Sequence, residues 1–289
     1  MPTTDPSTTK RALSQKQLIE QSIIKKFRKK LWNPFIQGIK QYEMIKPNDR
    51  IAVCISGGKD SMLMAKLLQQ LQKHSQIPFE LVFTVMDPGY NNENRQQVLL
   101  NANTLGVPIT VFNTNIFDTV ATLEGSPCYL CARMRRGYLY KNAQEHGCNK
   151  IALGHHLNDV IETTVLSMFY GAQIQAMLPK LRSSNFPGMQ LIRPLYAVKE
   201  HAITSWRDYH NLQFIQCACR FTEYCTPDPD SGGSKRQEVK RLIKNLTNAN
   251  PDIENHIFKS IHNVKLDTLP GYKSHGKHHS FLDFFAEEV

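Results

Sequence analysis

Residues 50–64, "RIAVCISGGKDSMLM", decide the fold, because an apolar run ends in Ser-Gly-Gly and a helical pattern follows at once. Residues 51–55 predict a short buried strand. From about Asp60 onward, apolar residues follow the spacing of one helix face: Leu63, Met64, Leu67 and Leu68. A strand, a glycine turn and a helix start in direct succession predict an anion-binding site.

The physical basis of that prediction is the supply of backbone donors. Glycines let successive N–H groups turn toward one point, and a helix start adds unpaired N–H groups and a positive dipole end. A Walker loop is excluded, because the chain has no Gly-x-x-x-x-Gly-Lys-Ser/Thr here, and a Rossmann fingerprint is also missing. The alternative is an ordinary tight turn. The hexapeptide Ser-Gly-Gly-x-Asp-Ser resembles the pyrophosphate loop of the PP-loop ATPases.

This resemblance implies cleavage of ATP between its α and β phosphates, with transfer of AMP to an oxygen of the substrate. The loop would hold the departing pyrophosphate. Asp60 and Ser61 are expected to cap the helix and to help hold Mg²⁺. The nucleotide-binding residues implied by the loop are Ser56, Gly57, Gly58, Lys59, Asp60 and Ser61.

Composition favours a polyanionic partner. The chain has 289 residues, enough to bury the core of one large domain, and its 35 Lys and Arg against 25 Asp and Glu give a net charge of +10. Nucleic acid is favoured over a membrane, because no long apolar run exists. Residues 1–17 are polar and show no signal-peptide pattern, so we expect a cytoplasmic protein.

Two basic clusters are candidates for RNA contact. Residues 25–30, "KKFRKK", lie on a predicted helix whose apolar positions pack inward, and a solvated helix face is the alternative there. Arg133, Arg135 and Arg136 follow a cysteine pair. Because arginine binds phosphate bidentately and stacks on bases, the second cluster predicts a nucleic-acid contact more strongly.

Seven cysteines are too many to ignore and odd in number, which argues against a disulfide framework. Cys54 and Cys148 are single and predict core positions. The others form a Cys-x-x-Cys pair and a late group: Cys128 and Cys131, then Cys217, Cys219 and Cys225. Half of a zinc site, a redox pair and part of an iron–sulfur cluster all fit the pair. A three-cysteine cluster is favoured over a zinc ribbon, because no second Cys-x-x-Cys exists.

A second strand–turn–helix pattern lies at "IALGHHLNDVIETT". A zinc role for its two histidines is disfavoured, because adjacent side chains point apart. The segment resembles the Gly-His-His/Asn-x-x-Asp-x-x-Glu-Thr motif that forms the far wall of the nucleotide site in PP-loop tRNA-modifying enzymes. The site residues this implies are Gly154, His155, Asp159 and Glu162.

The order of motifs along the chain resembles the tRNA 2-thiocytidine biosynthesis family. They are "SGGKDS", "CYLCARMRRGYLY", "GHHLNDVIETTVLSMFYG", "MLPKL", "IRPL" and a late cysteine group followed by "KRQEVKRLI". The match runs from about Trp32 to "FLDFF". It implies that the C2 oxygen of an anticodon-loop cytidine, position 32, is adenylated with Asp60 taking part, and then replaced by sulfur that comes from a cysteine desulfurase.

In that family three cysteines hold a 4Fe–4S cluster whose open iron carries the sulfur. Cys128 and Cys131 match directly, whereas the late group departs from the usual Cys-x-x-Cys. Cys219 aligns best as the third ligand, with Cys217 and Cys225 left open. Two other functions stay as alternatives: a zinc-bearing PP-loop tRNA ligase of the lysidine-synthetase type, and a non-enzymatic RNA-binding protein with a vestigial loop. The oligomeric state is open, with a homodimer as one alternative.

Predicted strands near residues 51–55, 80–85, 109–112 and 150–153 alternate with helical stretches. This alternation predicts an α/β fold, a doubly wound parallel sheet of the PP-loop (HUP-like) type, with ATP at the carboxyl ends of the strands. Asp87 follows the second strand and is expected near the adenosine, or else forms an Asp-Pro-Gly turn. Residues 1–32 predict a basic helical extension, 33–215 the PP-loop domain and 216–289 a cysteine-containing helical extension, ending in a His-rich mobile tail.

Overall fold

The computed structural model describes residues 13–121, 127–215 and 234–285. The chain divides into two compact units, the first made of residues 1–160 and 177–233 and the second of residues 161–176 and 234–289. The boundaries expected from the sequence, after residues 32 and 215, stay a prediction. Within the described ranges, no helix has both the length and the apolar character needed to cross a membrane.

A six-stranded sheet forms the centre of the first unit, in the order β3-β2-β1-β4-β6-β5. Every neighbouring pair is parallel except β5 with β6 at the edge, so the predicted α/β fold class is confirmed. Its strands are β1 (Arg50–Ile55), β2 (Glu80–Asp87), β3 (Ile109–Asn113), β4 (Lys150–Ala152), β5 (Lys180–Arg182) and β6 (Gln190–Ile192).

The first four strands lie where the sequence predicts them, and the last two were not predicted. β5 and β6 contain three residues each, as β4 does, but they have only one and two apolar residues in succession, whereas residues 151–153 form an apolar run of three. Their pairing depends on neighbours far along the chain, since Leu191 of β6 lies beside Ile151 of β4.

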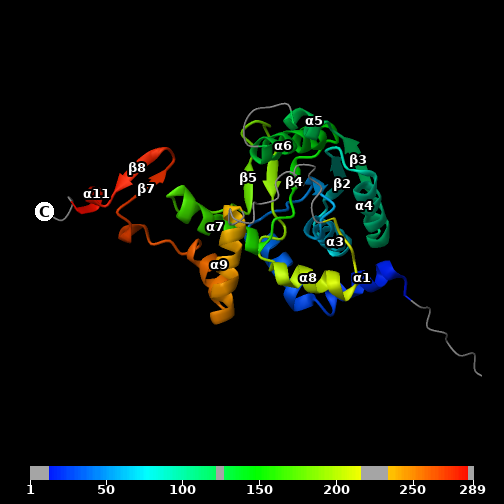
Figure 1. Ribbon diagram of the computed structural model, residues 1–289, viewed down its shortest axis with the longest axis horizontal. Coiled ribbons are helices and arrows are strands. Elements are labelled where there is room, and N and C mark those ends of the chain that lie inside the picture. Colours follow the sequence, from blue (N-terminus) through cyan, green and yellow to red (C-terminus); the bar gives the residue numbers. More distant parts are fainter. Residues whose placement is uncertain (1–12, 122–126, 216–233, 286–289) are drawn as a thin grey trace, which may run out of the picture. The chain divides into compact units, whose positions relative to one another are not determined.

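Helices cover both faces of this sheet, as a doubly wound fold requires (Figure 1). Helices α5 and α6 lie on one face, and α3 lies on the other with α1 and α8 packed against it. Five of the six residues of β1 are buried, because a parallel strand between two helical layers has no solvent face. The helices are α3 (Lys59–His74), α4 (Asn92–Leu105), α5 (Ile116–Ala121), α6 (Pro127–Glu145) and α8 (Glu200–Tyr209).

The basic N-terminal segment forms α1 (Gln15–Ile24), a π-helical turn η1 (Arg28–Trp32) and α2 (Asn33–Gln41). Five apolar positions of this segment are expected to pack inward. Ile19, Ile23 and Leu31 are fully buried and Phe27 is buried, whereas Ile24 is partly exposed. Lys66 of α3 holds the segment in place, because its buried ammonium lies 2.8 Å from the Glu20 carboxylate. Loss of Glu20 would leave a buried cation without its counter-charge, which costs several kcal/mol, about 3–5.

Helix α7 (Leu157–Gly171) starts in the first unit and continues into the second. The second unit also contains α9 (Lys235–Ala249), α10 (Ile253–Ser260), η4 (Leu266–Thr268), β7 (Gly271–Ser274), β8 (Lys277–Ser280) and α11 (Leu282–Phe285). The predicted mobile tail is therefore wrong, because "KSHGKHH" forms the turn of an antiparallel hairpin. His275 and Gly276 both have positive φ, 48° and 77°, as a two-residue type I′ turn needs.

Candidate functional site

The loop between β1 and α3 has a conformation that only glycine adopts easily. Gly57 has φ of 82°, in the left-handed region. A Cβ atom added there would lie 2.6 Å from both Val98 Cγ2 and Ile215 Cδ1. The backbone of this loop is therefore held in one place by packing as well as by its own turn.

Helix α3 begins without a side-chain cap. Its N-cap is Gly58, in extended conformation, and no described side chain bonds to the amides of its first turn as a cap. The expected capping by Asp60 and Ser61 is wrong, since the Ser61 hydroxyl lies 3.0 Å from the Gly58 carbonyl and accepts a bond from Ser56 N–H at 3.1 Å. The first-turn N–H groups of a helix have no intrahelical partners, so this helix start suits an anion.

Asp60 lies in this first turn, and its two carboxylate oxygens have different surroundings. Its Oδ2 lies 3.1 Å from the Lys59 ammonium, which also lies 3.2 Å from Glu200. Its Oδ1 is buried, accepts no hydrogen bond from the described residues and lies 3.8 Å from His156 Nε2. A buried carboxylate oxygen of this kind is a ligand that Mg²⁺ favours.

The second loop, between β4 and α7, closes its own helix start. The His156 N–H donates to Asp159 Oδ2 at 3.0 Å, and the Asp159 N–H donates to His156 Nδ1 at 3.3 Å. This reciprocal pair has the geometry of a capping box. Because Nδ1 accepts, the neutral ring carries its proton on Nε2, the atom that faces Asp60. The sequence-based prediction named His155 and missed His156, although the His-x-x-Asp spacing was a signal.

Gly154 is the point where the two loops touch. A Cβ atom at this position would lie 3.0 Å from Ser61 N and 3.1 Å from Ser61 Cα. These neighbours are backbone atoms of the first turn of α3, which cannot swing aside as a flexible side chain can. Gly154 is therefore required because β4 ends directly against the start of α3.

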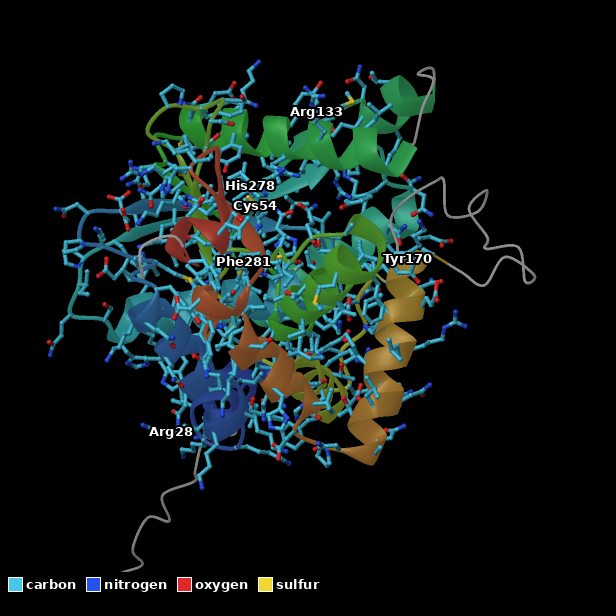
Figure 2. All side chains as sticks on the ribbon, turned by 90° about the vertical axis from the view of Figure 1, so that its left-hand side faces the viewer. Arg28, Cys54, Arg133, Tyr170, His278 and Phe281 are labelled. Atoms are coloured by element: carbon cyan, nitrogen blue, oxygen red, sulfur yellow. The ribbon has the colours of Figure 1, made fainter. Side chains whose placement is uncertain are left out.

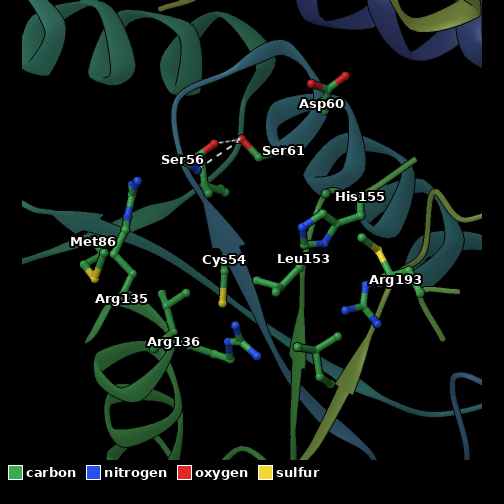
Figure 3. A pocket seen from close by; sticks show the side chains of 15 residues that line it. Cys54, Ser56, Asp60, Ser61, Met86, Arg135, Arg136, Leu153, His155 and Arg193 are labelled. Atoms are coloured by element: carbon green, nitrogen blue, oxygen red, sulfur yellow. Dashed lines mark hydrogen bonds between the residues drawn. The ribbon is translucent and has the colours of Figure 1, made fainter. Parts of the chain in front are cut away.

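A cavity of about 470 Å³ opens beside the first loop (Figure 3). This volume is within the range of small-molecule sites. Five predicted site residues line it: Ser56, Asp60, Ser61, Gly154 and His155. Helix α6 contributes Arg135 and Arg136 on the other side, and Arg193 follows β6. The predicted Gly58 and Lys59 instead line a neighbouring polar cavity with Glu200.

Arg193 is a site residue that the sequence analysis missed. Burial and repulsion from Arg136 lower the pKa of its guanidinium to about 10, so it stays charged at neutral pH. One of its NH groups donates to the Leu178 carbonyl, whereas its Nε is buried without a partner among the described residues. Two mutually repelling cations beside one cavity favour an anionic ligand there.

Asp87 forms the turn that follows β2. Its Oδ1 accepts hydrogen bonds from the N–H groups of Gly89, at 2.9 Å, and Tyr90, at 2.7 Å, in agreement with the turn-forming alternative. The Tyr90 hydroxyl then donates to the Ser56 carbonyl at 3.2 Å. Asp87 thus supports the first loop through Tyr90, and its contact with adenosine stays a prediction.

Glu162 belongs to the part of α7 that lies in the second unit. Its carboxylate is 3.2 Å from Arg236 and 4.0 Å from Lys240, both on α9. The structure therefore gives Glu162 two cationic partners, and its role toward a nucleotide stays a prediction. Asp159, one turn earlier, lies in the first unit and acts on His156.

Of the predicted cluster ligands, Cys131 is the one whose side chain the structure describes. It is buried on α6 and packs with Met86, Ile116 and Phe117. Met86 also lines the cavity beside the loop. Cys128 lies in the first turn of the same helix, but its side chain falls outside the described part of the structure. The late cysteines also lie outside the described residues: Cys217, Cys219 and Cys225.

The two single cysteines occupy the core, as predicted. Cys54 in β1 and Cys148 after α6 are both buried, in one cluster with Ile151. Burial raises the pKa of the Cys54 thiol to about 12 and also raises that of Cys148. Both are protonated thiols at neutral pH, which makes them weak metal ligands and weak nucleophiles.

Residues 22–219 match the family of PP-loop domains. The tRNA-cytidine(32) 2-sulfurtransferase of Alkalilimnicola ehrlichii is 36% identical over 263 residues, which cover 89% of this chain and 80% of that protein. The chain belongs to this sulfurtransferase family. The tRNA-cytidine(32) 2-sulfurtransferase of Burkholderia ambifaria is 35% identical and is covered to 74%.

A solved structure shows the same fold as this family member. It is the U34-tRNA thiolase NcsA from Methanococcus maripaludis with its [4Fe-4S] cluster, at a TM-score of 0.62 and 22% identity. The match covers 88% of this chain and 82% of the thiolase chain. At this identity the likeness concerns the fold alone.

Proposed function

We propose that this protein is an ATP-dependent tRNA sulfurtransferase that replaces the C2 oxygen of cytidine 32 in an anticodon loop with sulfur. The observation that carries the proposal concerns Met86. Its side chain lines the cavity at the first loop, the proposed phosphate loop, and also packs against Cys131. The cavity at the first loop and the helix that contains Cys131 are thus neighbours. Adenylation and sulfur delivery need this proximity, because the activated base must meet both.

The residues of the loop fit the phosphates of ATP. Gly57 turns the backbone, and the uncapped start of α3 supplies N–H donors. Arg136 and Arg193 bring positive charge to the same cavity. Asp60 fits Mg²⁺, since its Oδ1 is buried and has no hydrogen-bond donor among the described residues.

The cysteines fit an iron–sulfur cluster through their chemistry. Cys131 is sheltered by apolar neighbours, one turn from a helix start whose dipole favours thiolates. We assign Cys128, Cys131 and one late cysteine, Cys219, as the ligands of a 4Fe–4S cluster. When bound, the cluster would supply the sulfur, with a cysteine desulfurase as its source.

In the proposed reaction, the C2 oxygen of the cytosine attacks the α-phosphorus of ATP and pyrophosphate leaves into the loop of Ser56–Ser61. The sulfur nucleophile then attacks C2, and AMP departs with the original oxygen. The protein binds the leaving pyrophosphate through the α3 amides and holds the negative phosphates against Arg135, Arg136 and Arg193. Apolar walls at Met86, Leu139 and Leu153 limit the access of water, which would hydrolyse the activated base.

Anaerobic reconstitution tests this proposal. Protein, ATP, Mg²⁺, sulfide and unmodified tRNA should yield 2-thiocytidine, detected by mass spectrometry of the nucleosides, together with AMP. The protein should be brown and contain iron. A colourless zinc protein, or ADP in place of AMP, would contradict the mechanism. A location in the cytoplasm fits this reaction, since tRNA is there.

Single cysteine substitutions separate the cluster from the core. Cys131→Ser should lose iron and thiolation but keep ATP binding, because the phosphate loop is a separate segment. Cys148→Ser is the matched control, since Cys148 is equally buried but belongs to the core cluster that includes Ile151. Among Cys217→Ser, Cys219→Ser and Cys225→Ser only one, expected to be Cys219→Ser, should lose iron fully. Full iron and activity in all of these variants would overturn the cluster assignment.

A further inference from the structure

A third cavity, of about 660 Å³, lies between helix α6 and the segment that follows β5. We call it the α6 cavity. Three arginines line it, Arg133 and Arg136 from α6 and Arg182 at the end of β5, and none of its described lining residues is acidic. Figure 2 shows Arg133 on helix α6. Three cations without a carboxylate make this cavity a site for an anion.

The aromatic and polar part of the lining is preformed. The rings of Tyr140 and Phe186 stack, with their centroids 5.0 Å apart and an angle of 17° between the planes. The Ser183 hydroxyl accepts from the Phe186 N–H at 3.2 Å, and the Ser183 N–H donates to the Met189 carbonyl at 2.9 Å. The cavity also has polar atoms at Ser184 and Asn185. Aromatic carbon, amide and hydroxyl groups together are the surroundings that a nucleobase prefers.

Arg136 connects the two cavities, because it lines both the cavity at the phosphate loop and the α6 cavity. A ligand that fills both must carry negative charge at regular intervals and flat rings between the charges. Single-stranded RNA has this structure, and a base in one cavity would place its neighbour in the next.

We propose that the α6 cavity binds the nucleotide next to the reacting cytidine, with its phosphate on Arg133 and Arg182 and its base against Phe186. This inference rests on the proposed function for the nature of the RNA. The site distinguishes an unstacked loop from a duplex, because only a splayed base can enter. It would hold the anticodon loop open while the target base lies at the phosphate loop.

The test is the affinity for unmodified tRNA as a function of salt, measured by fluorescence anisotropy without ATP. Arg182→Ala should weaken binding about tenfold and lower the slope of log Kd against log salt by about 0.7, the value for one single-strand phosphate. Lys141→Ala is the control, since Lys141 is an exposed cation on α6 that lines neither cavity. Equal affinity and slope for both variants and the wild type would overturn the inference.

A substitution at the aromatic wall separates base from phosphate contacts. Phe186→Leu keeps an apolar side chain but removes the aromatic ring, so it should weaken tRNA binding without a change in the salt slope. The isolated anticodon stem-loop should show the same losses as whole tRNA. If only whole tRNA shows them, the α6 cavity contacts the tRNA body and the inference is wrong.

Two further outcomes keep the inference and the proposed function distinguishable. If the wild type makes no 2-thiocytidine but Arg182→Ala still weakens binding of the stem-loop, the inference holds and the proposed reaction fails. If Arg182→Ala keeps its tRNA affinity but accepts sulfur poorly from a cysteine desulfurase, the α6 cavity serves a protein and the inference is overturned.

Discussion

The ends of β1 and β4 are two versions of the same local structure. Each of these neighbouring parallel strands ends in a glycine loop that leads directly into a helix. The start of α3 has glycine as its N-cap and no described side chain that caps it. The start of α7 is closed by the reciprocal bonds of His156 and Asp159. Two adjacent helix starts of similar sequence pattern therefore differ in what they offer a ligand.

The two helix starts therefore suit different roles: the start of α3 has donors that a ligand could use, and the start of α7 holds side chains in place. The uncapped helix keeps its backbone donors for an anion, whereas the capped helix uses its donors internally and is rigid. The rigid start then places His156 Nε2 within 3.8 Å of Asp60 on the uncapped one. The second loop thus places a ring nitrogen near a carboxylate of the first, while Gly154 sets how closely the two can approach.

The largest expected effect on activity is that of a substitution in the first turn of α3, the uncapped helix. Asp60→Ala removes the carboxylate oxygen assigned to Mg²⁺ and should lower AMP formation by about 10²–10³-fold, as the loss of a transition-state contact does. Iron content should not change. Glu80→Ala is the control. Glu80 is an exposed carboxylate that pairs with Arg50 at the start of β1 and β2, the opposite end of these strands from the first loop. If Asp60→Ala keeps its turnover, the first loop lacks the role in AMP formation that would distinguish it from the second loop.

A smaller effect should follow from the loss of His156, which caps α7. His156→Ala loses both the cap and the contact with Asp60, so we expect a 10–100-fold loss of activity, about that of an outer-shell partner, and lower stability. Asn is a good N-cap, so His156→Asn should recover the melting temperature but not the activity. Recovery of both by Asn would show that His156 only caps α7.

Gly154→Ala tests the contact between the loops. The added methyl group must displace backbone atoms of the first turn of α3, at a cost of about 1–3 kcal/mol as in other overpacked sites. We expect weaker ATP binding, measured by calorimetry, along with a lower melting temperature. The control is Gly137→Ala on α6, where an added Cβ meets no atom within 4 Å. Equal ATP affinity in the two variants would mean that the loops need not touch.

The smallest effect concerns pH and should leave both loops unaffected. His210 lies 2.7 Å from Ser22 of α1, and burial, with the charge of Lys26, lowers its pKa in the folded protein. The unfolded chain therefore binds this proton more readily, so stability present above pH 6.5 is lost as the pH falls toward the lower folded value. The melting temperature should fall between pH 7.5 and 5.5, and less so in His210→Gln. An equal fall in both would exclude His210 as the cause.

Local sequence was enough to predict the first loop and four of the six strands of the sheet. Gly57 needs positive φ, and the helix pattern after it begins within one residue of the expected place. Strands β1 to β4 lie in mainly apolar stretches that alternate with helical patterns, so their positions can be predicted from local sequence. The resemblance of whole motifs added the family, which the comparisons confirm.

The features that the sequence did not predict depend mainly on contacts between distant segments. Arg193 enters the cavity because β6 pairs with β4, and nothing near it in the sequence indicates that pairing. The choice between His155 and His156 depends on which side chain turns back to cap α7. The His275–Gly276 turn was a local signal, but its histidines and lysines led us to expect a mobile tail.

Amide hydrogen exchange on addition of ATP and Mg²⁺ tests the contrast between the two helix starts most directly. Exchange over residues 57–62 should slow strongly, because phosphate oxygens accept from the amides before Met62, which lie ahead of the first intrahelical bond of α3. Exchange at residues 156–160 should change little, because those donors already have partners within the protein. Protection at residues 156–160 with none at 57–62 would contradict the assignment of the first loop as the phosphate site.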